Sequence, residues 1–228
     1  MAKYPLQADG IKKSYQNKLV VNVDLKIKNG EILGLVGKNG SGKTTTLNML
    51  CGVIHPDSGT VYIQNRADIA KNPDLKKDIT YLTEEKPDLD DLTVYEYLSF
   101  IAEVYGKSKN IIEDNLNQLD ISNVKNTKFM NLSKGYKQRV LFASILVADT
   151  PIIVLDEMTD GLDPAQQKHV FSIIEKLKKD KTIVMASHNM QELVNLCDRI
   201  CVIENGQIIK EVKTKDVDSF DRFANLLK

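Results

Sequence analysis

Residues 31–50 read EILGLVGKNGSGKTTTLNML and join a short apolar run to a glycine-rich stretch and the start of a helix. The run over 31–36 predicts a buried strand, and 44–50 has the pattern of a helix. Between them, GKNGSGKT over 37–44 satisfies the pattern GxxxxGK[ST], in which backbone amides and a helix N-terminus bind phosphate groups. The stretch therefore predicts a nucleoside triphosphate site, formed by Gly37, Lys38, Asn39, Gly40, Ser41, Gly42, Lys43, Thr44 and Thr45.

Two residues of this loop have distinct expected roles. The Lys43 ammonium group should reach the β and γ phosphates, and the Thr44 hydroxyl should bind Mg²⁺. A dinucleotide site is disfavoured because Thr45 stands where the third glycine of GxGxxG would be. A GTPase is disfavoured because no glycine in the chain follows an aspartate by three positions, as the DxxG element requires.

A second stretch, IIVLDE over 152–157, places two carboxylates at the end of an apolar run. Ligands of open α/β sheets bind at the carboxyl ends of the strands. Asp156 is therefore a candidate Mg²⁺ ligand, and Glu157 is a candidate for polarising the attacking water. An acidic surface turn is the alternative, but it would not explain the pairing with a phosphate loop.

Apolar periodicity along the chain indicates an α/β fold. Compact apolar runs at 31–36, 151–155, 182–186 and 199–203 predict strands buried on both faces, as in a parallel sheet. Apolar residues at every second position over 21–27 predict an antiparallel or edge strand. From 84 to 149 helical patterns replace the strand signals, and Thr93 with Glu96 can form a capping box there.

Composition narrows the class of protein further. Hydrophobic residues make up 42% and charged residues 27% of 228 residues, which excludes a wholly disordered chain. The 31 basic and 31 acidic residues cancel, so we expect no nucleic acid partner. No apolar run approaches the roughly 20 residues of a membrane span, and the first residues lack the apolar core of a signal peptide, so we expect the chain in the cytoplasm. Three cysteines without CxxC spacing predict neither a disulfide framework nor a zinc cluster.

The stretch LSKGYKQR over 132–139, placed ahead of IIVLDE, resembles the signature of the ATP-binding subunits of ABC transporters. The resemblance extends over nearly the whole chain. It implies one ABC ATPase domain over 1–228, with a phosphate-loop (RecA-like) α/β core, an antiparallel β edge and an inserted helical subdomain. The corresponding ranges are 1–83 and 150–210 for the core, 84–149 for the helical insertion and 211–228 for a C-terminal appendage.

The same resemblance implies roles for residues outside the phosphate loop. Tyr15 resembles the aromatic residue that stacks on adenine, although a surface tyrosine is the alternative. Asp163 resembles the residue that communicates across a dimer, and His188 the histidine that contacts the γ phosphate. Ser133 and Gly135 of the signature would complete the ATP site of a second subunit.

Two departures from the family pattern affect these roles. Glu84 occupies the place of a glutamine that contacts Mg²⁺, with Glu85 as the alternative for that role. Lys134 and Tyr136 replace a glycine and a glutamine of the signature. Both departures are similar to the ABC-2 type exporter branch, which writes these loops as LPEE and LSKG.

The expected function is therefore ATP binding and hydrolysis that energise transport through separate transmembrane permease subunits, in an exporter. Two ATP-binding subunits, identical or different, would sandwich two nucleotides on the cytoplasmic face of a membrane, with ATP and Mg²⁺ as the cofactors. Tyr95, Tyr97 and Phe100 are candidates for the surface that meets the permease. The alternatives are a soluble ABC ATPase acting on ribosomes or nucleic acid, and a regulatory cassette that binds ATP without turnover. The sequence does not identify the cargo.

Overall fold

The computed structural model describes residues 3–64, 68–83, 88–159 and 162–216. The chain forms two compact units. The first, here called the core unit, comprises residues 1–81, 151–157 and 174–228. The second, the helical unit, comprises residues 82–150 and 158–173.

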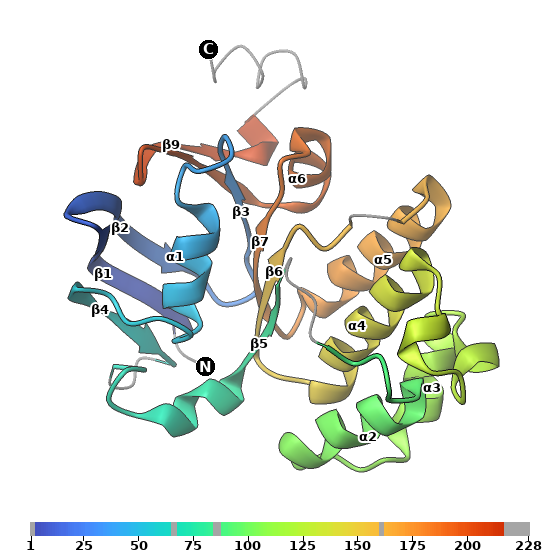
Figure 1. Ribbon diagram of the computed structural model, residues 1–228. Helices are drawn as coiled ribbons and strands as arrows, with labels where there is room; N and C mark the ends of the chain where they lie inside the picture. The colour runs from blue at the N-terminus through green and yellow to red at the C-terminus, as the bar shows by residue number, and fades with distance from the viewer. Residues whose placement is uncertain (1–2, 65–67, 84–87, 160–161, 217–228) are drawn as a thin grey trace. The chain divides into compact units, whose positions relative to one another are not determined.

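A six-stranded sheet forms the centre of the core unit, with the strand order β5-β6-β7-β3-β8-β9 (Figure 1). Strands β6, β7, β3 and β8 are parallel, and β9 is antiparallel to β8. Every residue of β3, β6 and β7 is buried, which explains why these strands are continuous apolar runs in the sequence. The bounds are β3 Ile32–Val36, β5 Ile79–Leu82, β6 Ile152–Asp156, β7 Thr182–Ala186, β8 Arg199–Glu204 and β9 Gln207–Lys213.

A second sheet of the core unit is antiparallel and has the order β2-β1-β4. Its strands are β1 Leu6–Tyr15, β2 Lys18–Ile27 and β4 Ser58–Ile63. The apolar residues at alternate positions from Val21 to Ile27 are buried, while Asp24 and Lys26 between them are exposed, so the predicted one-faced strand is confirmed. Gly59 of β4 has no room for a side chain, because a Cβ atom there would lie 2.2 Å from the carbonyl oxygen of Gly10.

Helix α1, Lys43–Leu50, packs between the two sheets and shares one apolar cluster with both (Figure 1). Its buried Leu47 and Leu50 lie in this cluster with Ile11 of β1 and Val154 of β6. The short helix α6, Met190–Leu196, follows β7 and contacts β3. Burial of α1 between two sheets fixes the loop that precedes it.

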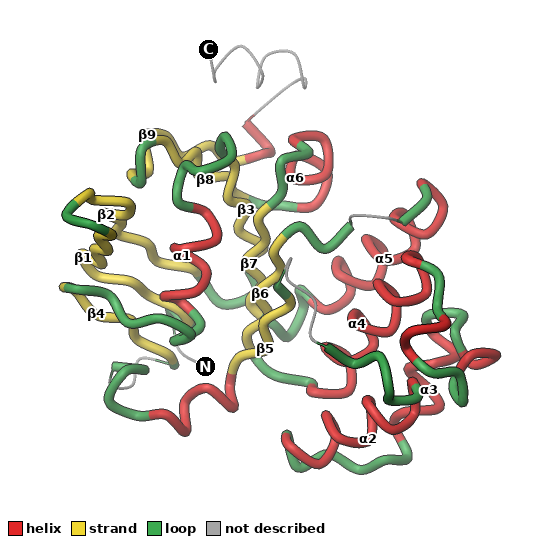
Figure 2. The backbone as a smooth tube through the Cα atoms, viewed as in Figure 1, coloured by secondary structure: helices red, strands yellow, loops and turns green. Residues whose placement is uncertain are grey.

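The helical unit is built around α4, Lys134–Ala148 (Figure 2). The α4 residues from Val140 onward are nearly all buried. Helices α2, Val94–Val104, and α3, Ile111–Gln118, pack against it. Thr93 and Glu96 form the predicted capping box at the start of α2. Helix α5, Pro164–Leu177, begins in this unit. Short 3₁₀ turns lie at Ser122–Val124 and Phe129–Asn131 in this unit, and at Pro73–Asp78 and Thr214–Asp216 in the core unit.

Several element bounds differ from the sequence prediction by a few residues, and two of these differences have a clear physical cause. Helix α1 begins at Lys43, one residue early, because the Gly42 carbonyl already accepts a hydrogen bond from the Thr46 amide. Strand β9 continues through Lys213 and pairs with β8, so residues 211–213 belong to the sheet and not to a C-terminal appendage. Within the described residues, no helix has both the length and the apolar character that a membrane crossing requires.

Candidate nucleotide-binding and catalytic site

The phosphate loop connects β3 to α1 and depends on close backbone approach at Gly37. A Cβ atom at Gly37 would lie 2.3 Å from the Ile203 carbonyl oxygen and 2.5 Å from Ser41 Oγ. Gly40 and Gly42 have φ angles of +77° and +105°, a region that side chains disfavour. Glycine is thus required at these positions by space or by backbone conformation, as the motif predicted.

The Lys43 ammonium group binds the backbone of its own loop. Its Nζ donates to the carbonyl oxygens of Gly37 at 2.8 Å and Lys38 at 3.4 Å, and the side chain is buried. Ser41 Oγ is also buried and has no hydrogen-bond partner among the described residues. A buried cation and an unsatisfied hydroxyl, at the N-terminus of a helix, form a site that fits a phosphate group.

Asp156 is the last residue of β6 and is almost fully buried. Cys51, at the C-terminal end of α1, has a thiol whose pKa is raised well above its usual value, first by burial and second by the negative charge of Asp156. Thr44, in the first turn of α1, has an exposed side chain. No cluster of three or more histidine, cysteine or acidic side chains that could hold a metal occurs in the described part of the chain. One carboxylate and one hydroxyl suit Mg²⁺, which normally completes its coordination with phosphate oxygens and water.

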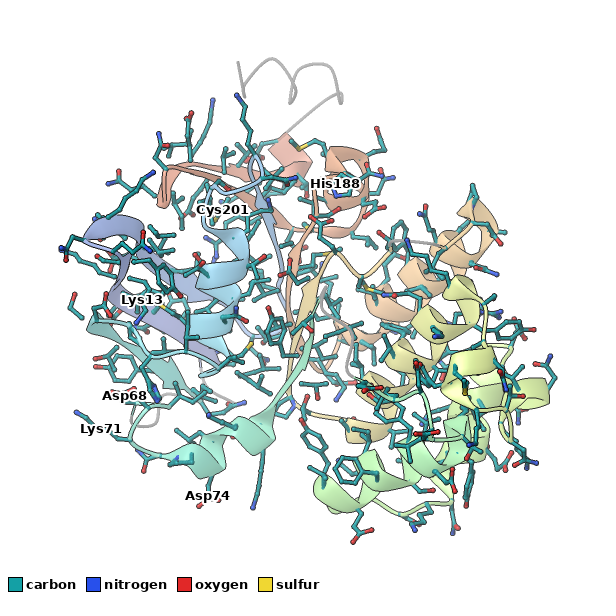
Figure 3. The ribbon with its side chains drawn as sticks, in the orientation of Figure 1. Lys13, Asp68, Lys71, Asp74, His188 and Cys201 are labelled. Atoms are coloured by element: carbon teal, nitrogen blue, oxygen red, sulfur yellow. The ribbon has the colours of Figure 1, made fainter. Side chains whose placement is uncertain are left out.

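Glu157 and His188 form a directly bonded pair at the carboxyl ends of β6 and β7 (Figure 3 labels His188). Glu157 Oε2 accepts hydrogen bonds from His188 Nδ1 at 2.7 Å and from the His188 amide at 3.2 Å. The parallel register pairs Asp156 with Ala186, so the residues that follow each strand meet at one edge. The Glu157 side chain is 11% exposed and that of His188 is 63% exposed.

The backbone at Glu157 has a φ angle of +50°, which is uncommon for a residue with a side chain. Its amide donates to the Ala186 carbonyl oxygen at 3.0 Å, and this bond holds the unusual conformation. A carboxylate placed this way, beside an imidazole and directly after Asp156, can accept a proton from water.

Tyr15 ends β1 and its ring is half exposed. The Lys13 ammonium lies 5.9 Å from the centre of that ring. Lys13 also forms an ion pair of 2.7 Å with Asp57, and the Ser14 amide donates to the same carboxylate (Figure 3 labels Lys13). These bonds, the Lys13 hydrogen bond first, lower the pKa of Asp57. The end of β1 that carries Tyr15 is thereby fixed.

The signature residues belong to the helical unit. Ser133 is the N-cap of α4, and its Oγ accepts a hydrogen bond from the Tyr136 amide at 3.4 Å. Gly135 lies in the first turn of that helix. The Tyr136 hydroxyl accepts a hydrogen bond from Asn123 Nδ2 at 3.1 Å, and the Arg139 guanidinium lies 4.5 Å from the centre of the Tyr136 ring. The Asn123 bond first, and the interaction with Arg139 second, lower the pKa of Tyr136.

Asp163 caps helix α5, since its carboxylate accepts from the Gln166 amide at 2.9 Å. The expected roles of Glu84 and Glu85 fall on residues outside those that the structure describes. The phosphate loop, Tyr15, Asp156, Glu157 and His188 belong to the core unit, whereas Ser133, Gly135 and Asp163 belong to the helical unit.

Sequence reasoning missed three polar residues that hold backbone or side chains in place, two in the core unit and one in the helical unit. Glu192 accepts hydrogen bonds from the side chains that flank His188, and Asp57 holds the end of β1. Gln138 of α4 donates its side-chain amide to the Met158 carbonyl oxygen. A local signal existed only for Glu192, which stands three residues after Asn189 in the N-cap pattern.

A strand, phosphate loop and helix, followed by a second strand that ends in two carboxylates, define a phosphate-loop nucleoside triphosphatase. The comparisons identify its family: residues 20–160, more than half of the chain, match the family described as ABC transporter. The chain belongs to the ABC transporter family and is one of its ATP-binding subunits.

Similar proteins support this assignment. The "Nod factor export ATP-binding protein I" of Burkholderia orbicola (strain AU 1054) is 36% identical over 218 residues, which cover 92% of this chain and 71% of that protein. A solved structure described as an "ATP binding subunit of ABC transporter" superposes with a TM-score of 0.90 at 24% identity, over 98% of this chain and 99% of that one, and shows the common fold.

A third similar protein bears on the reaction. The cassette MJ0796, solved as a dimer in a post-hydrolysis state bound to ADP and Pi, is 25% identical with a TM-score of 0.85, over 92% of this chain and 98% of that one. A further structure of MJ0796 is described as dimeric, and the similar protein cbiO1 of Clostridium perfringens is described as part of the ABC transporter complex cbiONQ. This chain is accordingly an ATPase subunit that binds and hydrolyses ATP to energise transport through separate membrane components. These relatives carry transporter names, and none of them supports an action on ribosomes or nucleic acid.

Proposed function

We propose that the phosphate loop, Asp156, Glu157 and His188 form the hydrolytic centre for MgATP. The observation that carries this proposal is the hydrogen bond between Glu157 and His188. Glu157 directly follows Asp156, and His188 follows the neighbouring strand β7 at the same edge of the parallel sheet. Glu157 acts as the base that takes a proton from the attacking water, and the His188 ring holds the Glu157 carboxylate through Nδ1. Lys43 exchanges its two backbone carbonyl partners for phosphate oxygens.

The metal proposed for this centre is Mg²⁺, held by the Thr44 hydroxyl and the Asp156 carboxylate. Bound there, it would neutralise charge on the phosphates. Glu84 is proposed as a further ligand from the family resemblance alone, since it lies outside the described residues. Tyr15 is proposed to stack on the adenine ring, and its half-exposed face supports that role.

A second ATP-binding subunit, identical or different, is proposed to complete each site. Ser133 and Gly135 at the N-terminus of α4 offer a hydroxyl and backbone amides to phosphate, with Asp163 communicating between the subunits. ATP would then bridge two subunits, and its hydrolysis would release them. Poor turnover by the isolated monomer follows.

The transport partners are proposed to be separate permease subunits of an exporter, with this chain on the cytoplasmic face of their membrane. The similarity to a protein named for Nod factor export supports the direction of transport. Of the aromatic residues considered for the contact surface, Phe100 is 58% exposed and Tyr95 37% exposed, so both remain candidates. The proposal of Tyr97 as a residue that contacts the permease is wrong, because its side chain is buried and packs edge-to-face against the Phe129 ring.

The decisive test is the Glu157→Gln variant. The amide keeps the shape of the side chain but cannot take a proton, so turnover should fall by about 10²-fold or more while ATP affinity stays near that of the wild type. The ATP-bound variant should elute as a dimer in size-exclusion chromatography. Lys43→Ala is the matched control, because it should lose most ATP affinity in calorimetry and stay monomeric. Wild-type turnover by Glu157→Gln would refute the assignment of the base.

A further inference from the structure

His188 sits in a three-residue connection between β7 and α6, and its own packing does not fix it. The imidazole is 63% exposed, and both its bond to Glu157 and the backbone that carries it help to set its direction. Exposed side chains retain rotamer freedom unless hydrogen bonds restrict them. What holds this short backbone segment therefore determines whether His188 faces Glu157.

Both neighbours of His188 are tied to one buried carboxylate. Ser187 Oγ donates to Glu192 Oε2 at 3.0 Å, and Asn189 Nδ2 donates to Glu192 Oε1 at 3.1 Å. The Asn189 amide also donates to Ser187 Oγ at 3.0 Å, which closes the segment around His188. Ser187 is 2% exposed and Glu192 is 5% exposed, so water does not compete strongly for the bond between them, whereas the Asn189 bonds are partly buried.

Burial of the Glu192 carboxylate has an unfavourable desolvation free energy. Removing a carboxylate from water costs free energy unless hydrogen bonds compensate, and an apolar residue would pack there without that cost. Each of its oxygens instead accepts a hydrogen bond from a residue adjacent to His188. The preceding residue of the helix, Gln191, is exposed, and its side-chain amide donates to Asn195 Oδ1 and not to a neighbour of His188. Gln191 therefore lacks the two contacts that Glu192 makes.

We propose that Glu192 is a positioning residue for ATP hydrolysis. It holds Ser187 and Asn189 so that the His188 backbone amide and Nδ1 both donate hydrogen bonds to the Glu157 carboxylate. This inference rests on the roles proposed above for Glu157 and His188. Glu192 touches neither of them in its two bonds to Ser187 and Asn189, so it acts through the backbone. Loss of its carboxylate would leave the buried Ser187 hydroxyl and the more exposed Asn189 side-chain amide without this acceptor, and would allow the segment to move.

The first test reads His188 directly, without ATP. The Glu157 carboxylate can only accept, so His188 Nδ1 must carry a proton in the wild-type protein. The 228-residue chain is labelled with ¹⁵N at its three histidines, and its NMR spectrum should contain the resonance of this protonated Nδ1. The resonance that disappears in the His188→Ala variant is assigned to His188. Glu192→Ala should shift the resonance toward that of a free imidazole, whereas Gln191→Ala, the control from the same helix, should leave it unchanged. An unshifted His188 resonance in folded Glu192→Ala overturns the proposal.

The second test separates positioning from stability. Glu192→Ala should lower kcat about tenfold and leave the Kd for ATP within about twofold of wild type, since it misplaces a group by a fraction of an ångström. In a His188→Ala background the same change should have almost no further effect on kcat, because both variants remove one shared function. An equal loss in both backgrounds would show a merely structural role and overturn the inference.

Two further variants keep the test valid if Glu192→Ala does not fold. Glu192→Gln keeps the size of the side chain and one acceptor, so it should lose less activity than Ser187→Ala, which removes the hydroxyl shared by the network. Wild-type kcat in both variants would refute the inference. Failure of the proposed function gives a different result, in which His188→Ala itself retains wild-type turnover.

Discussion

Gly37→Ala tests whether the phosphate loop depends on close packing against the neighbouring strand. The added Cβ atom would lie 2.3 Å from the Ile203 carbonyl oxygen, where a carbon–oxygen contact normally needs about 3.3 Å. The backbone must then move by about 1 Å, because the obstacle is a strand carbonyl and not the end of a flexible side chain. Overpacking of this kind costs about 2–3 kcal/mol of the free energy of unfolding.

The displaced loop should also bind ATP less well. A shift of about 1 Å in a positioned group can cost about 100-fold, so we expect the Kd for ATP to rise between tenfold and 100-fold. Isothermal titration calorimetry measures the affinity, and urea denaturation followed by circular dichroism measures the stability of the ATP-free chain.

Gly106→Ala is the matched control, since Gly106 has a φ angle of +64° but no atom within 4 Å of an added Cβ. It should lose about 1 kcal/mol from backbone strain alone and keep wild-type ATP affinity. If Gly37→Ala binds ATP like the wild type, or destabilises the chain no more than Gly106→Ala does, the loop does not require this approach and our reasoning is wrong.

Two other predictions concern the core unit. Lys13 and the Ser14 amide lower the pKa of Asp57 below its ordinary value of 3.8, so their stabilisation is present above that pH and is lost as the pH falls through the lower folded value. Asp57→Asn should therefore lower the thermal midpoint at neutral pH, with a difference that shrinks below pH 3.8; a difference that stays constant with pH would contradict this. Burial raises the pKa of Cys201 to about 12 and also raises those of Cys51 and Cys197, so iodoacetamide at about pH 8 should label the three cysteines only after denaturation, as mass spectrometry would show. Rapid labelling of the native chain would contradict their burial.

The phosphate loop could be predicted from sequence because all its determinants are local. Strand β3, the glycines and helix α1 are consecutive in the chain, and each has a periodicity or residue type that the fold requires. The same holds for the capping box at Thr93 and for the alternating residues of β2. Local conformational preference and burial agree at these places, so no distant contact was needed to recognise them.

Strands β1, β4 and β9 were not recognised from the sequence, because pairing with other strands holds them in place and their own apolar patterns are weak. β1 pairs with both β2 and β4, and β9 owes its place to pairing with β8. The β9 residues alternate between exposed and partly buried, a pattern weaker than that of the central strands. Edge strands satisfy backbone hydrogen bonds on one side only and need less apolar sequence to do so.

The sequence by itself determined that this chain binds a triphosphate and which two carboxylates follow the second strand. Only the tertiary structure decided that Glu157 bonds to His188, 31 positions away, because that contact exists once β6 and β7 align in parallel with Asp156 opposite Ala186. Tertiary folding likewise brings Asp57 to Lys13 across 44 positions. Such contacts depend on register between distant segments, which no local pattern of residues encodes.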